Sequence, residues 1–208
     1  MEYTLQHIAA PSDKLPRSFY DRPALSVARD LLGKVLVLEG EGGRRVARIV
    51  EVEAYVGEHD LACHAARGRT PRTEVLFGPP GYAYVYLIYG VHHCFNVVTC
   101  REGRAAAVLV RGVEPLQGVP PRQRTDGPGR LCDALGVTLA HNRVDLTGDR
   151  LFLLGAPPLP AARVARGPRI GVDYAGAWAH KPYRLWVRDH PHVSRPPVRP
   201  VPSGPRGA

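Results

Sequence analysis

The sequence predicts a single domain of the α+β class, in which short strands outnumber short helices. The length of 208 residues suits one domain with a sizeable core, and neither an internal repeat nor an interior linker divides the chain. Most of the periodic stretches alternate or run apolar over strand lengths, and only two carry a helical stripe. The hydrophobic content of 44% and the charged content of 23% are ordinary for a globular protein.

Two short helices follow from their end signals. The first opens with Asp21-Arg-Pro23, carries an apolar stripe and ends at Gly33, and the second covers residues 130–135 and is capped by Gly136. Residues 57–81 are rich in glycine and proline and are expected to form a loop. Strands are predicted over residues 35–38, 44–56, 82–89, 93–99, 105–111, 151–154 and 183–187.

The stretch with the most chemistry is residues 48–64, RIVEVEAYVGEHDLACH. Strand alternation divides its first half into an aliphatic face and a face that carries Ile49, Glu51, Glu53 and Tyr55. Two carboxylates and a phenol then follow one another at intervals of about 7 Å. A carboxylate on an inner strand is costly unless it is paired or solvated. The pattern alone leaves two interpretations open: an edge strand whose polar face lies in water, or a functional site.

The charge balance favours a polyanionic partner. The net charge is +9, and only three of the cationic residues are lysines. An excess of arginine is typical of proteins that bind nucleic acid, although a genome rich in G and C also raises it. Arg67, Arg69 and Arg72 lie in the predicted loop, where they either contact phosphates or face water.

The cysteine content and the hydropathy favour an intracellular protein. The four cysteines form no C-x-x-C pair and no disulfide-like pattern, so free thiols in a reducing compartment are expected. No apolar run approaches transmembrane length, and the N-terminal residues lack the pattern of a signal peptide. We therefore expect a soluble cytoplasmic protein, associated with the nucleoid in a bacterium or located in the nucleus of a eukaryote.

Several polar and aromatic residues suit one pocket. Aromatic rings with amide and imidazole groups can hold a flat heterocycle between them and read its edge, and a carboxylate beside such a pocket can serve as a general base for water. These residues are Glu53, Tyr55, His64, Tyr84, Tyr86, Tyr89, Asn96 and Arg111.

At this point the residues resemble a known family. The motifs are RIVEVEAYVG, TPR, YAYVYLIYGVHHCFNVV, VLVRGVEPL, GPGRLC and AGAWAHKPYRLWVR. Together they resemble the alkyladenine (3-methyladenine) DNA glycosylases, over a region from about Phe19 to Arg188. Several ordered motifs at family-like spacing make a chance match improbable, whereas E-A-Y alone would be weak.

The resemblance implies a fold and an activity. The fold would be a single mixed domain with a curved, mostly antiparallel β-sheet of the formyltransferase-like type and a protruding β-hairpin. The domain would span residues 19–189, after an N-terminal arm of residues 1–18 and before a mobile Pro/Arg-rich tail of residues 190–208. The activity would be hydrolysis of the N-glycosidic bond of alkylated or deaminated purines in double-stranded DNA, by a monomer that needs no metal and no organic cofactor.

The resemblance also implies roles for individual residues. Glu53 would activate the attacking water, and Arg111 would help to hold that water and the sugar-phosphate. Tyr55, Tyr86 and His64 would hold the flipped base, Asn96 would collide with a guanine 2-amino group, and Tyr84 and Leu109 complete the base-binding set. Tyr89 would enter the minor groove and fill the gap that the base leaves. The other expected DNA contacts are Val91, Arg69, Arg72, Arg130 and Lys181. Glu51 is expected to have a structural role.

The chain departs from the family pattern at one place, and three rival interpretations remain. His92 and His93 follow Val91, where the family commonly carries bulkier apolar or aromatic side chains. One rival is a metal site drawn from Cys63, His64, His92, His93, Cys94 and Cys100, whose spacings fit no standard zinc pattern. The others are a basic nucleic-acid-binding module without activity, and an RNA-directed or formyl-transferring enzyme. Because no lysine falls at a position that matches the family's catalytic or base-binding residues, a strand-cutting Schiff-base activity is not expected.

Overall fold

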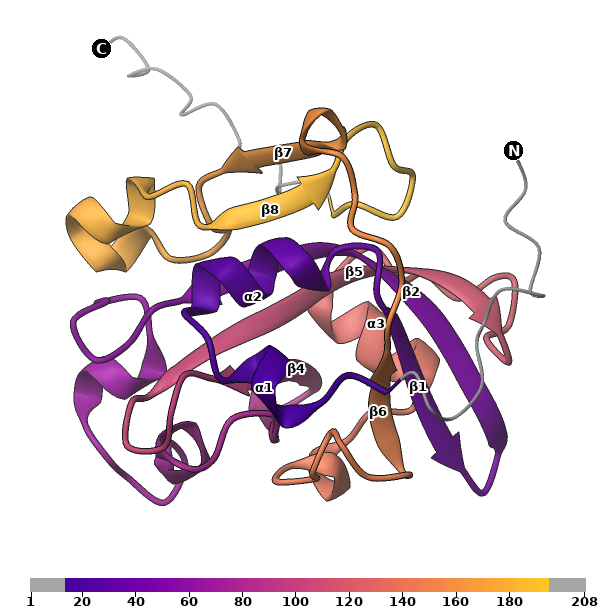
Figure 1. Cartoon of the computed structure of the whole chain (residues 1–208), viewed down its shortest axis with the longest axis horizontal. Helices are drawn as coiled ribbons and strands as arrows, with labels where there is room; N and C mark the ends of the chain where they lie inside the picture. The colour runs from indigo at the N-terminus through magenta and orange to yellow at the C-terminus, as the bar shows by residue number, and fades with distance from the viewer. Residues whose placement is uncertain (1–13, 195–208) are drawn as a thin grey trace, which may run out of the picture.

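The computed structural model describes residues 14–194 as a strand-rich α+β domain (Figure 1). The helices are α1 (Arg17–Tyr20), α2 (Ala24–Leu31) and α3 (Pro128–Leu135). The short 3-10 helices are η3 (His64–Arg67), η4 (Glu74–Phe77), η5 (Leu139–His141), η6 (Ala161–Arg163) and η7 (Asp173–His180). The strands are β1 (Val35–Gly40), β2 (Gly43–Tyr55), β3 (Ala83–Ile88), β4 (His92–Thr99), β5 (Ala106–Gln117), β6 (Leu151–Leu154), β7 (Val164–Gly167) and β8 (Arg184–Val187).

One curled antiparallel sheet contains all eight strands, and β2 lies at its centre. The main path runs β3-β4-β5-β2-β1-β6. Along one side β2 pairs with β5, and along the other it pairs first with β1 and then with β8, which carries β7 on its outer edge. Glu51 and Glu53 lie opposite β8, at Trp186 and Arg184. The edge-strand interpretation of residues 48–56 is therefore wrong, because β2 has partners on both sides.

Strand alternation separates the main core from a second face of the sheet. Val52, Phe95 and Val110 belong to the main core, which also contains the buried side chains of α2 and α3. Their neighbours along the strands lie on the other face, where Tyr84 packs in a smaller cluster with Leu76 and Ala107. The polar residues of β2, β3, β4 and β5 therefore meet on a face that is not part of the main core.

Three register shifts interrupt the pairing of β2 with β5, and the two beside Glu51 are bulges that break the alternation at the glutamates. The register shifts between Ile49 and Glu51 and again between Glu51 and Val52, so Val50 and Arg111 have no register partner. Because Val50 is an extra residue, Ile49 turns with it into the main core. The prediction that Ile49 shares a face with the glutamates is wrong for this reason.

Most of the other predicted elements are confirmed. The first of the two predicted helices corresponds to α2, which ends shortly before Gly33 at φ +86°. The second corresponds to α3, which ends at Gly136 in the left-handed conformation. The sequence patterns missed β7, which is short and partly exposed. All four cysteines are free. The described chain has no helix that is both long and apolar enough to cross a membrane.

The predicted terminal segments lie partly outside the described residues. Of the N-terminal arm, residues 1–13 lie outside, and α1 begins within the rest of it. Of the predicted tail, residues 195–208 lie outside. Residues 190–194 pack on the sheet, where Ser194 is buried.

The β3–β4 hairpin protrudes, as expected. Its turn exposes 88% of Tyr89 and 65% of Val91. Tyr89 has φ +53°, a left-handed conformation that costs a residue with a side chain about 1–2 kcal/mol, and Gly90 follows at φ +72°. An exposed aromatic ring in a strained turn is thus the outermost part of this hairpin.

Candidate active site

A cavity of about 330 Å³ opens on the second face of the sheet. It is lined by side chains from β3, β4 and β5, by the end of β2, and by loops around His64 and Gly171. Eight of the predicted site residues line it: Tyr55, His64, Tyr84, Tyr86, Tyr89, Asn96, Leu109 and Arg111.

Register explains why residues so distant in sequence meet. Glu53 pairs with Leu109, Leu109 pairs with Asn96, and Asn96 pairs with Tyr84. Residues directly opposite each other in an antiparallel sheet share a face, so these four side chains form one row across β2, β5, β4 and β3. The row places Leu109 directly beside Glu53, and Asn96 and Tyr84 follow on the same face of the sheet.

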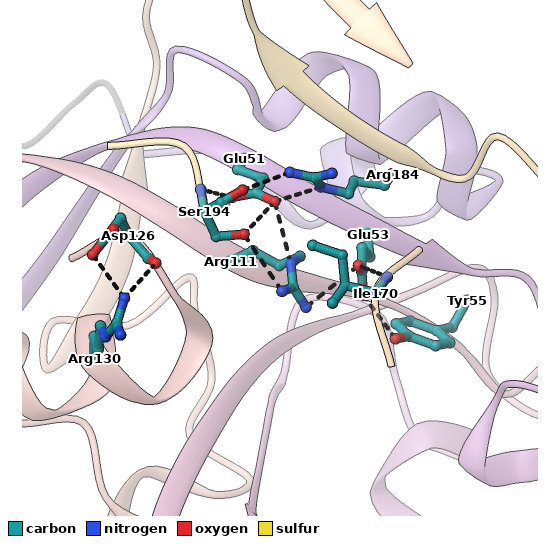
Figure 2. Close-up of polar contacts among 9 residues, drawn as sticks. All are labelled: Glu51, Glu53, Tyr55, Arg111, Asp126, Arg130, Ile170, Arg184 and Ser194. Carbon is teal, nitrogen blue, oxygen red and sulfur yellow. Dashed lines mark hydrogen bonds and ion pairs between the residues drawn. The ribbon is translucent and has the colours of Figure 1, made fainter. Parts of the chain in front are cut away.

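Glu53 is fully buried behind the wall of the cavity and is not itself a lining residue. Its Oε1 accepts a hydrogen bond from the backbone N–H of Ile170 at 2.7 Å and lies 3.3 Å from Nη1 of Arg111 (Figure 2). Its Oε2 accepts a hydrogen bond from the hydroxyl of Tyr55 at 2.9 Å. The three groups that hold Glu53 all belong to residues that line the cavity. The carboxylate is therefore paired and lies one layer behind the cavity surface.

Arg111 carries its charge in a buried position. Burial works against that charge, but Glu53 and Glu51 outweigh it and raise the pKa of Arg111 above its ordinary value. Because Arg111 is the extra residue of the second bulge, the change in strand direction there aims its side chain between the two glutamates.

The sequence patterns did not indicate the segment of Arg169 and Ile170, which also supports Glu53. Arg169 forms a bidentate pair with Asp60, at 2.5 and 2.8 Å, and both side chains are fully buried. Its guanidinium also lies 4.8 Å from the centre of the Tyr55 ring. This anchor fixes the next residue, Ile170, whose N–H reaches Glu53. A backbone donor leaves no signature in a sequence, and only the buried charge of Arg169 could have indicated it.

The aromatic side chains that line the cavity contact one another and are uncharged at neutral pH. Nδ1 of His64 lies 2.9 Å from the hydroxyl of Tyr84, and the His64 and Tyr86 rings are 4.6 Å apart. Burial raises the pKa of Tyr84 and Tyr86. Burial, helped by Arg72 and Arg67, lowers the pKa of His64 to about 4. At neutral pH these rings therefore present uncharged faces to the cavity.

Asn96 is buried on the cavity floor. Its Nδ2 donates to the backbone carbonyls of Tyr84 and Cys94, at 3.0 and 3.4 Å. A side chain held by two backbone groups cannot easily turn aside for a larger ligand. Cys63, Leu76, Cys94 and the exposed residue Tyr174 also line the cavity, and the sequence analysis had not placed any of them among the base-binding residues.

The remaining predicted DNA contacts lie on the surface around the cavity. Arg72 is exposed and lies over the Tyr86 ring at 5.1 Å, while Arg69 lies over Phe77. Arg130 pairs with Asp126 at 3.3 Å at the start of α3, whose Pro128 lines the cavity (Figure 2). Lys181 is exposed, 5.9 Å from the Trp178 ring. None of these four cationic side chains lines the cavity.

Cys63, His64 and Cys94 of the rival metal site all line the cavity, but they are not arranged as metal ligands. Among residues 14–194, no group of three or more His, Cys, Asp or Glu side chains is arranged to hold a metal ion. His92 instead lies against Gly129 at the start of α3.

An aromatic cavity that is lined by an arginine and has a buried carboxylate directly behind its wall is suited to an enzyme that acts on a flat heterocyclic group. Comparison with known proteins agrees with that class. A family model described as methylpurine-DNA glycosylase (MPG) matches residues 18–191. The chain belongs to this family.

Curated relatives match most of the chain. A protein of Myxococcus xanthus is 69% identical over 183 residues, which are 88% of this chain and 94% of its own. A relative in Anaeromyxobacter dehalogenans is 56% identical over 185 residues, covering 88% and 87%. One in Legionella pneumophila is 48% identical over 183 residues, covering 88% and 98%. Each is named "Putative 3-methyladenine DNA glycosylase".

The buried state of His64 gives a first prediction. In an NMR titration its imidazole should change protonation near pH 4, and the His64→Gln variant assigns the signal. Because the folded pKa lies below the unfolded value of about 6.5, the stability that neutral His64 contributes should be complete above pH 6.5 and lost as the pH falls toward 4. A midpoint near pH 6.5 would show that the ring is solvated.

Proposed function

We propose that this protein is a monofunctional DNA glycosylase of base excision repair. It takes an alkylated or deaminated purine, of the 3-methyladenine, hypoxanthine or ethenoadenine class, out of double-stranded DNA into the cavity. It then hydrolyses the N-glycosidic bond as a monomer without a cofactor. The family membership supports a glycosylase acting on DNA, and one geometric observation carries the rest: the cross-strand row that joins Glu53 to Leu109, Asn96 and Tyr84.

The cavity walls hold the base and select it. Stacking on an aromatic ring is worth about 1–3 kcal/mol per base, so Tyr55, Tyr86 and His64 retain the purine rather than transform it. The amide of Asn96, held by two carbonyls, stands where a guanine 2-amino group would collide with it. Uncharged rings also accept a neutral or a cationic base, because neither has to displace a charge.

Glu53 accepts a proton from water as the water oxygen attacks the C1′ carbon of the deoxyribose. The bond between C1′ and the base nitrogen breaks, and its electron pair leaves with the base. The ionised carboxylate also stabilises the positive charge that the sugar develops. Arg111, whose Nη1 lies 3.3 Å from Oε1 of Glu53, places a positive charge beside this carboxylate and helps to hold the water. A cationic base such as 3-methyladenine leaves readily, whereas hypoxanthine gains a proton as it leaves.

Removal of the carboxylate gives the decisive test. The Glu53→Gln variant should lose at least about 10²-fold in the single-turnover rate of base release and still bind the lesion duplex, because Gln keeps the shape but cannot take a proton. The substrates are duplexes with 3-methyladenine, hypoxanthine or 1,N6-ethenoadenine. The control is Glu39→Gln, an exposed carboxylate of the same sheet that pairs with Arg44.

The outcomes separate the alternatives. A Glu53→Gln variant that releases base at the wild-type rate would remove Glu53 from the mechanism. Should the wild-type protein bind all three duplexes and release no base from any of them, a non-enzymatic nucleic-acid-binding module is the better description.

Tyr89 is proposed to fill the gap left by the everted base. Extrusion costs a few kcal/mol, and an inserted side chain offsets part of that cost. Tyr89→Ala should therefore lower the equilibrium fraction of flipped base at least several-fold, read as 2-aminopurine fluorescence beside the lesion. Because the ring is 88% exposed, the free energy of unfolding should change by less than about 0.5 kcal/mol. Tyr89→Phe keeps the ring and should behave as wild type; equal fluorescence for all three proteins would rule out the wedge.

The lysines support a purely hydrolytic reaction. Nζ of Lys14 contacts Gly148 and Asp149, Nζ of Lys34 donates to the Ala156 carbonyl at 2.5 Å, and Lys181 lies near Trp178. None of these three side chains lines the cavity. Borohydride added during turnover should therefore trap no protein–DNA adduct, with a lyase-active glycosylase as the positive control. A trapped adduct would establish a Schiff base and contradict the monofunctional assignment.

A further inference from the structure

We propose that Glu51 is a positioning residue: with Arg184 and Ser194 it holds Arg111 at a fixed distance from Glu53 and thereby sets the pH range in which Glu53 takes up a proton. This inference rests on the proposed function, because it assumes that Glu53 is the general base. It gives a specific role to a carboxylate that touches neither the cavity nor the predicted substrate.

Glu51 is fully buried, and four donors surround its carboxylate (Figure 2). Nε of Arg184 reaches Oε1 at 2.6 Å, and the Ser194 hydroxyl donates to the same oxygen at 2.7 Å. The backbone N–H of Ser194 donates to Oε2 at 2.6 Å. Nε of Arg111 is the most distant donor, 3.3 Å from Oε1. The three short bonds from Arg184 and Ser194 fix the Glu51 carboxylate, and the longer contact with Arg111 connects it to the candidate site.

Arg111 is shared among three partners. Nε faces Glu51 at 3.3 Å, Nη1 faces Glu53 at 3.3 Å, and Nη2 faces the Ser194 hydroxyl at 3.4 Å. A fully engaged arginine–carboxylate pair is bidentate, with distances of about 2.7–2.9 Å. The pull of Glu51 thus keeps Arg111 from closing onto Glu53. Oε2 of Glu53, which accepts a hydrogen bond from the Tyr55 hydroxyl, therefore keeps a lone pair for water.

The segment that carries Ser194 is itself held tightly. A Cβ at Gly112 would lie 2.5 Å from the carbonyl oxygen of His192 and 3.2 Å from Glu51. Nδ1 of His192 lies 2.9 Å from the hydroxyl of Thr125, and Nη2 of Arg184 donates to the Ser194 carbonyl at 2.8 Å. Residues 190–194 therefore lie directly on β5 beside Arg111, and Ser194 is a fixed partner.

The charges around Glu53 predict the direction in which a substitution at Glu51 or Arg184 shifts the ionisation of Glu53. Two carboxylates and two guanidinium groups alternate along this line, with Glu51 about 7 Å from Glu53 by the strand rise. The other titratable or charged groups that interact with Glu53 are Arg169 before η7, Tyr55 of β2, Tyr86 of β3 and Cys94 of β4. Removal of the negative charge of Glu51 favours ionised Glu53, whereas removal of the positive charge of Arg184 disfavours it and draws Arg111 toward Glu51.

The test compares pH profiles. Single-turnover base release is measured from pH 5 to 8 on the lesion duplex that the wild-type protein processes fastest. Each profile is normalised to its own maximum, so that a loss of folded protein does not move the midpoint of the acid limb. We expect Glu51→Gln to lower that midpoint by about one pH unit and Arg184→Gln to raise it by about as much, as befits one charge at this separation. The Glu51→Gln/Arg184→Gln double variant should return close to the wild-type midpoint.

Ser194→Ala provides a milder variant that keeps all four charges. It removes the hydroxyl that lies between Glu51 and Arg111, so the maximal rate should fall at least about threefold while the midpoint stays unchanged. Glu39→Gln is again the control and should match the wild-type profile. This variant keeps the inference testable even where a single charge change prevents folding.

Opposite shifts distinguish positioning from support of the fold, since a merely destabilised protein would not move the two midpoints apart. Midpoints that coincide, or that move in the same direction, would overturn the inference, and so would a Ser194→Ala variant with the full wild-type rate. If Glu53→Gln releases base normally, the proposed function fails; if Glu53→Gln is inactive while the profiles of the other variants coincide with wild type, only the role of Glu51 fails.

Discussion

The structure depends on a balance of charge inside a β-sheet. Two carboxylates on the central strand β2 are fully buried, and neither could remain ionised there without a partner. Glu51 is satisfied by Arg184 and by Ser194, Glu53 by Tyr55 and by the Ile170 amide, and Arg111 contacts both. The pairing of β8 with β2 and the course of the chain after β8 are thus part of the same electrostatic arrangement as the candidate site.

The two bulges beside Glu51 interrupt the regular pairing of β2 with β5 and thereby shape the candidate site. In an unbroken ladder, every second residue of β2 and β5 would lie on the cavity face. The extra residues at Val50 and Arg111 change this: Ile49 enters the core, and Arg111 and Gly112 come to the side of Glu51. Gly112 has no side chain, and this allows residues 190–194 to approach β5 closely. Backbone geometry, rather than any additional functional side chain, brings Arg111 between the glutamates.

Much of the fold and of the cavity follows from local pattern. Side chains alternate along a strand, so the strand predicted over residues 82–89 puts Tyr84 and Tyr86 on one face, and both line the cavity. Gly33 and Gly136 marked helix ends because a left-handed residue is needed there. The hairpin turn at Tyr89 and Gly90 was visible in the same way. The sequence did not indicate the short strand β7, since its four residues are too few for an alternating pattern to be recognised.

The sequence by itself determined the family resemblance, the strand alternation and eight of the residues that line the cavity, because motifs, side-chain period and turn chemistry are local properties. Only the tertiary structure decided which strands pair with β2, where the register slips, and which distant groups reach the glutamates. Arg184, Ser194 and the Ile170 amide are separated from Glu51 and Glu53 by more than a hundred residues, and their contacts depend on strand order and on backbone donors. No local periodicity encodes either of these. For the same physical reason, the partners of a buried charge can be identified only after the chain has folded.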